Sequence, residues 1–148
     1  MFSVIEAIAA GAQSESEVWA RALRDAPEWE PVFSPLAPAE FALGVETVYE
    51  AYLVHYGTPR LFDAPDPDEA VLLGDYLYAH GLVRIAEVGG VGAVATMAEL
   101  ISHCAALRAD SLAGDGLAWV EAARALGGGP DAVAVAGALE RHSARVAA

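Results

Sequence analysis

The chain has 148 residues, a formal net charge of −13 and eight basic residues, all of them arginine. Without lysine and with so negative a balance, it cannot present the extended basic surface on which proteins bind nucleic acid. Apolar residues make up 55% of the chain and charged residues 20%, which excludes a disordered protein and predicts a single domain with a hydrophobic core.

The first residues and the lone cysteine indicate a cytoplasmic protein. The N-terminal sequence MFSVIEAIAAGAQ has no basic segment and carries Glu6 inside a short apolar run, which is not typical of a secretion signal. Cys104 has no second thiol with which to form a disulfide, so we expect it to be a small core residue. Asp75, Arg84 and Glu87 interrupt the best candidate stretch, and the sequence therefore predicts no membrane span.

Apolar residues recur at three- and four-residue spacing along the whole chain, and no alternating run is bounded by Asn-Gly or Asp-Gly turns. The sequence therefore predicts an all-α helical bundle in one domain, 1–148. Its parts are N-terminal helices with a connector (1–37), a central set of helices (38–127) and a closing helix (130–148). The expected helices cover residues 2–11, 15–25, 38–56, 67–88, 91–109, 112–127 and 130–146.

Three of these helices begin at residues typical of helix N-termini. Ser14 and Glu17 have the spacing of a capping box, in which a serine caps the helix and a glutamate bonds back to it. Asp66 followed by Pro67 predicts a capping residue and a first helical position. Asp131, after a Gly-Gly-Gly-Pro run, predicts the start of the last helix.

Prolines and glycines mark the breaks between helices. Four prolines in residues 27–38 exclude an α-helix there, and we expect Trp29 and Phe33 of this connector to pack on the core. Gly89-Gly90 and the glycines at 127–129 indicate helix ends. The closing helix has alanine and valine on most faces, so it either completes the bundle or forms an oligomer contact.

The helix expected over 67–88 is apolar around much of its circumference, yet it carries Gly74 and Asp75 in its middle. Glycine costs about 1 kcal/mol relative to alanine inside a helix, so we expect a neighbouring backbone to cross close to Gly74. Asp75 is expected at a solvated rim or in an internal hydrogen bond, because an unpaired buried carboxylate is costly.

The same segment, EAVLLGDYLYAHGLVRIAEVG (69–89), resembles a helix of the trans-isoprenyl (polyprenyl) diphosphate synthases that has the pattern A-V-L-x-G-D-x-L-x-A. Upstream, ETVYEAYLVHYG (46–57) is similar to that family's E-L-I-H-x-A-S-L-I-H-D-D. The resemblance covers roughly residues 39 to 112 and implies an isoprenoid-synthase-like helical bundle. The family's pocket positions then fall on His55, Tyr56, Arg60 and Asp75.

The family's metal-binding residues are missing from this pattern. Its histidine is followed by a D-D-x-x-D motif that binds Mg²⁺, whereas this chain has Tyr56, Gly57 and Arg60 at those positions. The second aspartate-rich motif and the N-terminal basic diphosphate grip have no counterpart. A different, gap-free alignment places residues 46–50, which include Glu46 and Glu50, over the first aspartate motif, and the sequence leaves both alignments open.

Outside the resemblance, the segment FDAPDPDE offers weak metal ligands in Asp63, Asp66 and Asp68. Carboxylates of this kind could hold Mg²⁺ or Ca²⁺, but helix capping explains them more simply. The four histidines have no spacing that would place two of them on one helix face as zinc ligands. We therefore expect neither a metal site nor a catalytic residue.

These observations favour a non-catalytic partner or regulatory subunit of a polyprenyl diphosphate synthase, because heteromeric members of that family use such a subunit. Such a chain is expected to form homo- or hetero-oligomers. One alternative is a module that binds a prenyl or other apolar chain without reacting it. Another is a residual prenyltransferase that gathers Mg²⁺ on Glu46 and Glu50 or on the 63–69 acids; only this alternative needs a cofactor.

Overall fold

The computed structural model describes residues 3–146, which form six α-helices and no β-strand. This confirms the all-α prediction, although several helix boundaries differ from those expected. The helices are α1 (Val4–Glu15), α2 (Glu17–Ala22), α3 (Ala42–Tyr56), α4 (Pro67–Ala109), α5 (Asp115–Ala125) and α6 (Ala132–Val146), with 3-10 turns η1 (Ser34–Leu36) and η2 (Ala39–Phe41).

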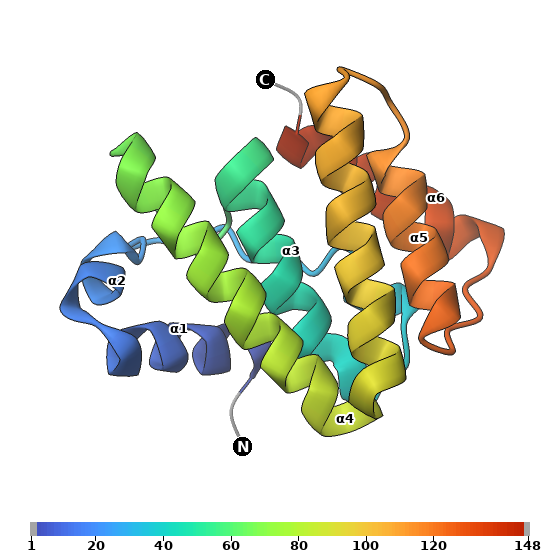
Figure 1. Ribbon diagram of the computed structural model, residues 1–148, viewed down its shortest axis with the longest axis horizontal. Coiled ribbons are helices and arrows are strands. Elements are labelled where there is room, and N and C mark those ends of the chain that lie inside the picture. Colours follow the sequence, from blue (N-terminus) through green and yellow to red (C-terminus); the bar gives the residue numbers. More distant parts are fainter. Residues whose placement is uncertain (1–2, 147–148) are drawn as a thin grey trace.

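Helix α3 lies at the centre of the molecule. Figure 1 shows α4 crossing in front of it, α1 and α2 on one side, and α5 and α6 on the other. Every residue of α3 from Gly44 to Leu53 is buried, including the polar ones. A helix surrounded in this way must satisfy its polar side chains inside the protein, and these side chains define the internal sites described below.

Helix α4 is bent into two limbs at Gly90, which form the V visible in Figure 1. Gly90 has φ 67° and ψ −158°, a backbone conformation that residues with a Cβ atom rarely adopt. The expected helices 67–88 and 91–109 are therefore the two limbs of one kinked helix, and the predicted break at Gly89-Gly90 is the kink.

Glycines allow α3 and α4 to approach each other closely. A Cβ on Gly81 would lie 2.6 Å from Cγ2 and 3.1 Å from the backbone N of Val48, and one on Gly44 would lie 2.6 Å from Cδ1 of Ile85. A Cβ on Gly74 would overlap the ring of His55. The prediction that a neighbouring backbone crosses close to Gly74 was wrong: the nearest group there is the side chain of His55, and the close backbone approach is at Gly81.

The capping predictions were right for two helices and wrong for a third. Asp66 accepts a hydrogen bond from the backbone N–H two residues later, and Asp131 from the one three residues later. Ser14 lies within α1, and Ser16 caps α2 instead, by accepting from the N–H three residues later. Glu17 is consequently the first residue of α2, which is not the capping-box position.

The connector and the cysteine are where the sequence placed them. Residues 27–38 contain no α-helix, Phe33 is fully buried, and Trp29 is half-buried against the core. Cys104 is also buried, and this burial raises the pKa of its thiol to about 12, so the thiol stays protonated at neutral pH. The predictions that Trp29 and Phe33 pack on the core and that Cys104 is a core residue are therefore confirmed.

By length and composition alone, α4 is apolar enough to cross a membrane. Asp75, Arg84 and Glu87 were expected to exclude this helix as a membrane span, but by length and composition α4 still qualifies as a candidate. Only 17% of its most apolar 18-residue window is buried inside the bundle. This exposure separates α4 from an ordinary core helix and needs an explanation.

The close approach of α3 and α4 can be tested by replacing two glycines with alanine, each in a separate variant. Gly81→Ala should lower the free energy of unfolding by about 1 kcal/mol, because overlap with Val48 outweighs the gain in helix propensity. Gly92→Ala should raise it by up to about 1 kcal/mol, because nothing lies within 4 Å of the added methyl group. Urea unfolding measures both, and equal stabilisation at the two sites would contradict the close contact.

Candidate functional site

Three of the four positions marked by the resemblance meet where α3 ends against the first limb of α4. His55 Nε2 lies 3.7 Å from Asp75 Oδ1, and the His55 ring packs edge-on against Tyr56. The side chain of Asp75 is 64% exposed, so it lies at a solvated rim, as expected. A hollow of about 440 Å³ opens beside this group and is lined by Val54, His55, Tyr56, Pro67, Ala70 and Val71.

Arg60, the fourth position, lies elsewhere. Its side chain is fully buried, and it donates through Nε to Glu50 at 3.0 Å and through Nη1 to Glu46. The guanidinium also lies 4.3 Å from the centre of the Trp29 ring. Because Glu46 and His55 are nine residues apart, about two and a half helical turns, they project from opposite sides of α3. The four positions therefore do not form one pocket.

The two glutamates of this ion cluster also hold backbone groups in place. Glu46 accepts from the N–H groups of Val32 and Ser34, and Glu50 accepts from those of Arg60 and Leu61. The cluster thus ties the proline-rich connector and the segment after α3 to the central helix. Carboxylates occupied in this way are not free to bind a metal ion from solvent.

The charge of Arg60 is maintained inside the protein. Burial by itself would lower the pKa of its guanidinium, but the neighbouring Glu46 and Glu50 carboxylates outweigh burial and raise the pKa above its ordinary value. The guanidinium therefore keeps its charge beside the two glutamates, whose other lone pairs accept from the backbone donors.

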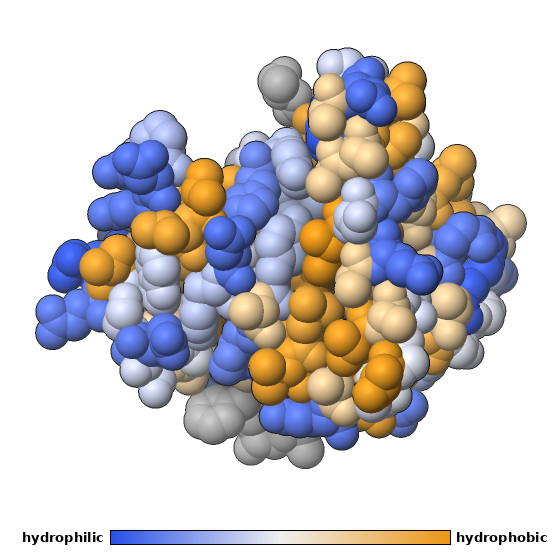
Figure 2. Space-filling model, in the orientation of Figure 1, coloured by the Kyte–Doolittle hydropathy of each residue, from blue (hydrophilic) through white to orange (hydrophobic). Residues whose placement is uncertain are grey.

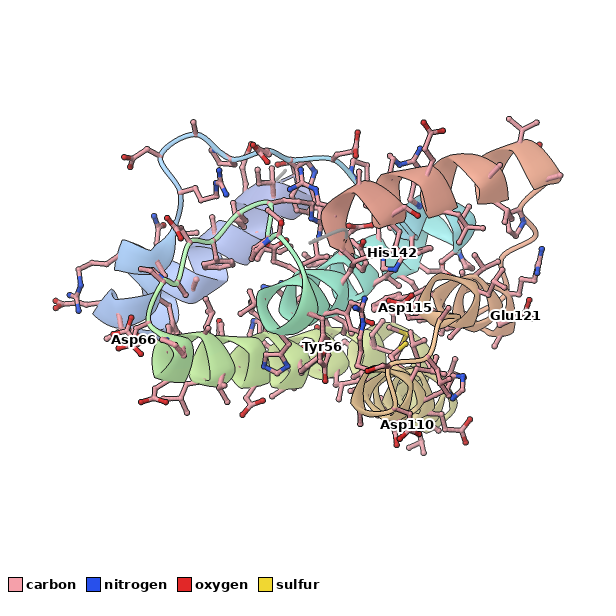
Figure 3. All side chains as sticks on the ribbon, turned by 90° about the horizontal axis from the view of Figure 1, so that it is seen from above. Tyr56, Asp66, Asp110, Asp115, Glu121 and His142 are labelled. Carbon is pink, nitrogen blue, oxygen red and sulfur yellow. The ribbon has the colours of Figure 1, made fainter. Side chains whose placement is uncertain are left out.

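The acidic segment before α4 is exposed to solvent. Asp66 caps the helix, and Asp63 and Asp68 are exposed to solvent. Within residues 3–146, no three His, Cys, Asp or Glu side chains are placed so that they could hold a metal ion. Figure 3 shows Asp66 near one end of the molecule, well away from Asp115 and His142.

A second internal polar network, which the sequence did not reveal, joins α3 to the C-terminal helices. Asp115 Oδ2 accepts from Tyr52 at 2.7 Å, from Arg108 at 2.7 Å and from His142 Nε2 at 3.1 Å. The other ring nitrogen of His142 lies 2.7 Å from the hydroxyl of Tyr49. The labelled Asp115 and His142 lie close together in Figure 3. Asp115 and Arg108 carry no sequence pattern that would have identified them.

This network resembles a Tyr-His-Asp catalytic arrangement but lacks its properties. Burial raises the pKa values of Tyr49 and Tyr52 far above those of free tyrosine, so their hydroxyls remain protonated. Both tyrosines and His142 are also almost completely inaccessible to solvent. We interpret the network as the polar part of the core.

The α4–α5 groove lies between the second limb of α4 and α5 and has a volume of about 510 Å³. Glu99 of α4 and Glu121 of α5 are among its lining residues, and Leu117 remains 60% exposed beside them. The complete lining consists of Thr96, Glu99, Leu100, His103, Gly114, Leu117, Ala118, Glu121, Ala122 and Ala125.

Apolar side chains also lie on the outside of α4. Figure 2 shows hydrophobic colouring where the two limbs of this helix meet. The large apolar residues of α4 that remain exposed are Val71, Leu72, Val83, Val88 and Val91. Exposed apolar side chains that gather on one part of a surface are typical of a contact with another molecule.

Comparison with protein-family models, with curated proteins and with solved structures gives no match to this chain. The resemblance to prenyl synthases therefore stays a prediction, carried by the residues of 46–57 and 69–89. These two segments belong to α3 and α4, which pack directly on each other.

Removing the buried cation tests the ion cluster. Arg60→Leu should lower the free energy of unfolding by about 3–5 kcal/mol, because it leaves Glu46 and Glu50 buried without their partner. The control is Arg21→Leu, whose side chain is 70% exposed and whose pair with Glu17 contributes less than about 1 kcal/mol. Chemical denaturation gives both values, and similar losses would contradict the structural role of Arg60.

Acid should weaken the Asp115 network. Burial would raise the pKa of Asp115, but hydrogen bonds from His142, Tyr52 and Arg108 outweigh burial and hold the pKa well below its ordinary value. The carboxylate therefore stabilises the folded state above about pH 4, and this contribution is lost as the pH falls further.

Between pH 7 and pH 3 the native chain should lose about 1 kcal/mol more unfolding free energy than Asp115→Asn, which has no carboxylate to titrate. Urea denaturation at the two pH values measures the difference. A parallel decline in both proteins would show that Asp115 is not the responsible group.

Proposed function

We propose that the protein is a non-catalytic partner or regulatory subunit of a polyprenyl diphosphate synthase. The observation that carries this proposal is the exposure of α4. This helix is apolar around much of its circumference, a pattern typical of a helix that is covered on most sides. Within this chain, only 17% of the most apolar window of α4 is buried. The segment that resembles the prenyl synthases lies in the first limb of this helix.

The internal polar clusters support a non-catalytic role. Ionising an allylic diphosphate requires carboxylates that gather Mg²⁺ and cations that stabilise the leaving group. Glu46 and Glu50, the ligands in the gap-free alignment, are occupied by Arg60 and by backbone donors. Arg60 is for the same reason unable to reach a diphosphate.

The packing of the interior weighs against a module that holds a prenyl chain between its helices. The rings of Phe33 and Trp119 stack with their centres 5.4 Å apart, and Tyr49 packs edge-on against both. These rings fill the space between α3 and the C-terminal helices. An apolar ligand would have to lie on the surface instead.

Co-expression with a polyprenyl diphosphate synthase from the same organism tests the proposal. We expect a stable complex by size-exclusion chromatography with light scattering, and a rate or product length that differs from that of the synthase alone. Val91→Asp, on α4, should raise the dissociation constant at least about tenfold. Val133→Asp on α6 is the matched control, since these side chains are 87% and 83% exposed.

Two results would contradict the proposal. One is the absence of a complex with any polyprenyl diphosphate synthase of that organism. The other is chain elongation by this protein alone, incubated with isopentenyl and allylic diphosphates and Mg²⁺, above a control without protein.

A further inference from the structure

We propose that the α4–α5 groove binds a helix of a different protein that presents large apolar side chains flanked by lysine or arginine. The inference goes beyond the proposed function, because it specifies the chemistry of the occupant whichever protein supplies it. It rests on the shape of the groove, the charges at its edges and the distribution of cations in the chain.

The groove has the shape and lining of a helix-binding site. Leu100 and Ala122 are buried in its floor, Ala118 is half-buried, and Leu117 and Ala125 are exposed. Small side chains on two neighbouring helices leave a trough that a third helix can fill with larger side chains. The exposed leucine supplies an apolar contact at the edge of that trough.

The ionised side chains in the groove lining are carboxylates. Glu99 is exposed on α4, and Glu121 is exposed on α5, where it contacts Arg124 at 2.7 Å. His103 is also exposed there and adds a polar group. A helix with basic residues on both sides of its apolar face would match this arrangement, since opposite charges at the rim favour association.

A second copy of this chain does not provide such a helix. The sequence has no lysine, and every one of its eight arginines already contacts an acceptor within the chain. The arginines and their partners are Arg21 with Glu17, Arg24 with Glu28, Arg60 with Glu46 and Glu50, Arg84 with Thr47, Arg108 with Asp115, Arg124 with Glu121, Arg141 with Val32 and Arg145 with Glu28.

The same shortage of cations disfavours a lipid surface. Peripheral proteins bind anionic membranes through clusters of lysine and arginine next to their apolar residues. With a net charge of −13, this chain is repelled by such a surface and by another copy of itself. The occupant that remains consistent with both the apolar floor and the acidic edges is a cationic protein helix.

The test uses a synthetic 18-residue helical peptide with leucines along one face and lysines at both edges of that face, labelled with fluorescein. A matched peptide carries glutamate in place of every lysine. Fluorescence anisotropy with the full chain should show at least tenfold tighter binding of the lysine peptide. Affinity should fall as salt is raised, because the edge contacts are electrostatic.

Two pairs of variants locate the binding site. Glu99→Gln with Glu121→Gln should weaken binding of the lysine peptide at least tenfold. Glu40→Gln with Glu140→Gln changes the net charge equally, outside the groove, and should change affinity less than twofold. Leu117→Ser should weaken binding at least fivefold, whereas Val133→Ser, at an exposed position of α6 outside the groove, should leave it unchanged.

Several results would overturn the inference. Equal weakening by both glutamine pairs would mean general attraction to an acidic protein, and failure of the lysine peptide to bind at 1 mM would mean that no helix is accepted. A dimer of the chain alone in sedimentation equilibrium that Leu117→Ser dissociates would assign the groove to self-association. Binding to phosphatidylcholine–phosphatidylglycerol vesicles (7:3) that Leu117→Ser abolishes would assign it to lipid.

Discussion

The buried contact of Arg60 with Glu46 and Glu50 is the interaction on which the rest of the structure depends. Two carboxylates inside a helical protein are tolerated only when they are neutralised and hydrogen-bonded. Here the guanidinium and four backbone N–H groups satisfy both carboxylates. The cluster fixes the connector against α3 and directs the chain into α4. The carboxylates of Glu46 and Glu50 are thereby part of the fold.

Helices α3 and α4 have similarly apolar sequences but opposite surroundings. Ten consecutive residues of α3, Gly44 to Leu53, are buried. Its polar groups therefore face internal partners on two sides, the Arg60 cluster and the Asp115 network. Helix α4 packs one side on α3 through glycine contacts and leaves much of its surface open. That difference in burial, and not composition, distinguishes α4 from α3.

The sequence revealed the features that depend on neighbours along the chain. Asp66 and Asp131 were identified as caps because a cap bonds within its own first turn. The spacing of Ser14 to Glu17 matches a capping box, but the residue that caps α2 is Ser16. The contacts of Arg60 and Asp115 join residues far apart in the chain, and no local pattern predicts which cation meets which carboxylate.

The charge distribution and the exposed apolar surface are two aspects of one arrangement. A chain that exposes a long apolar helix would ordinarily associate with itself, because burying apolar area contributes about 25 cal/mol for each Å². Here each copy carries a net charge of −13, and its arginines are all engaged internally, so two copies that meet bring together unneutralised carboxylates. The same carboxylates attract a partner that supplies cations. In the proposed complex, the net charge therefore favours a cationic partner over a second copy of the chain. The groove between α4 and α5 favours a partner segment with the shape of a helix.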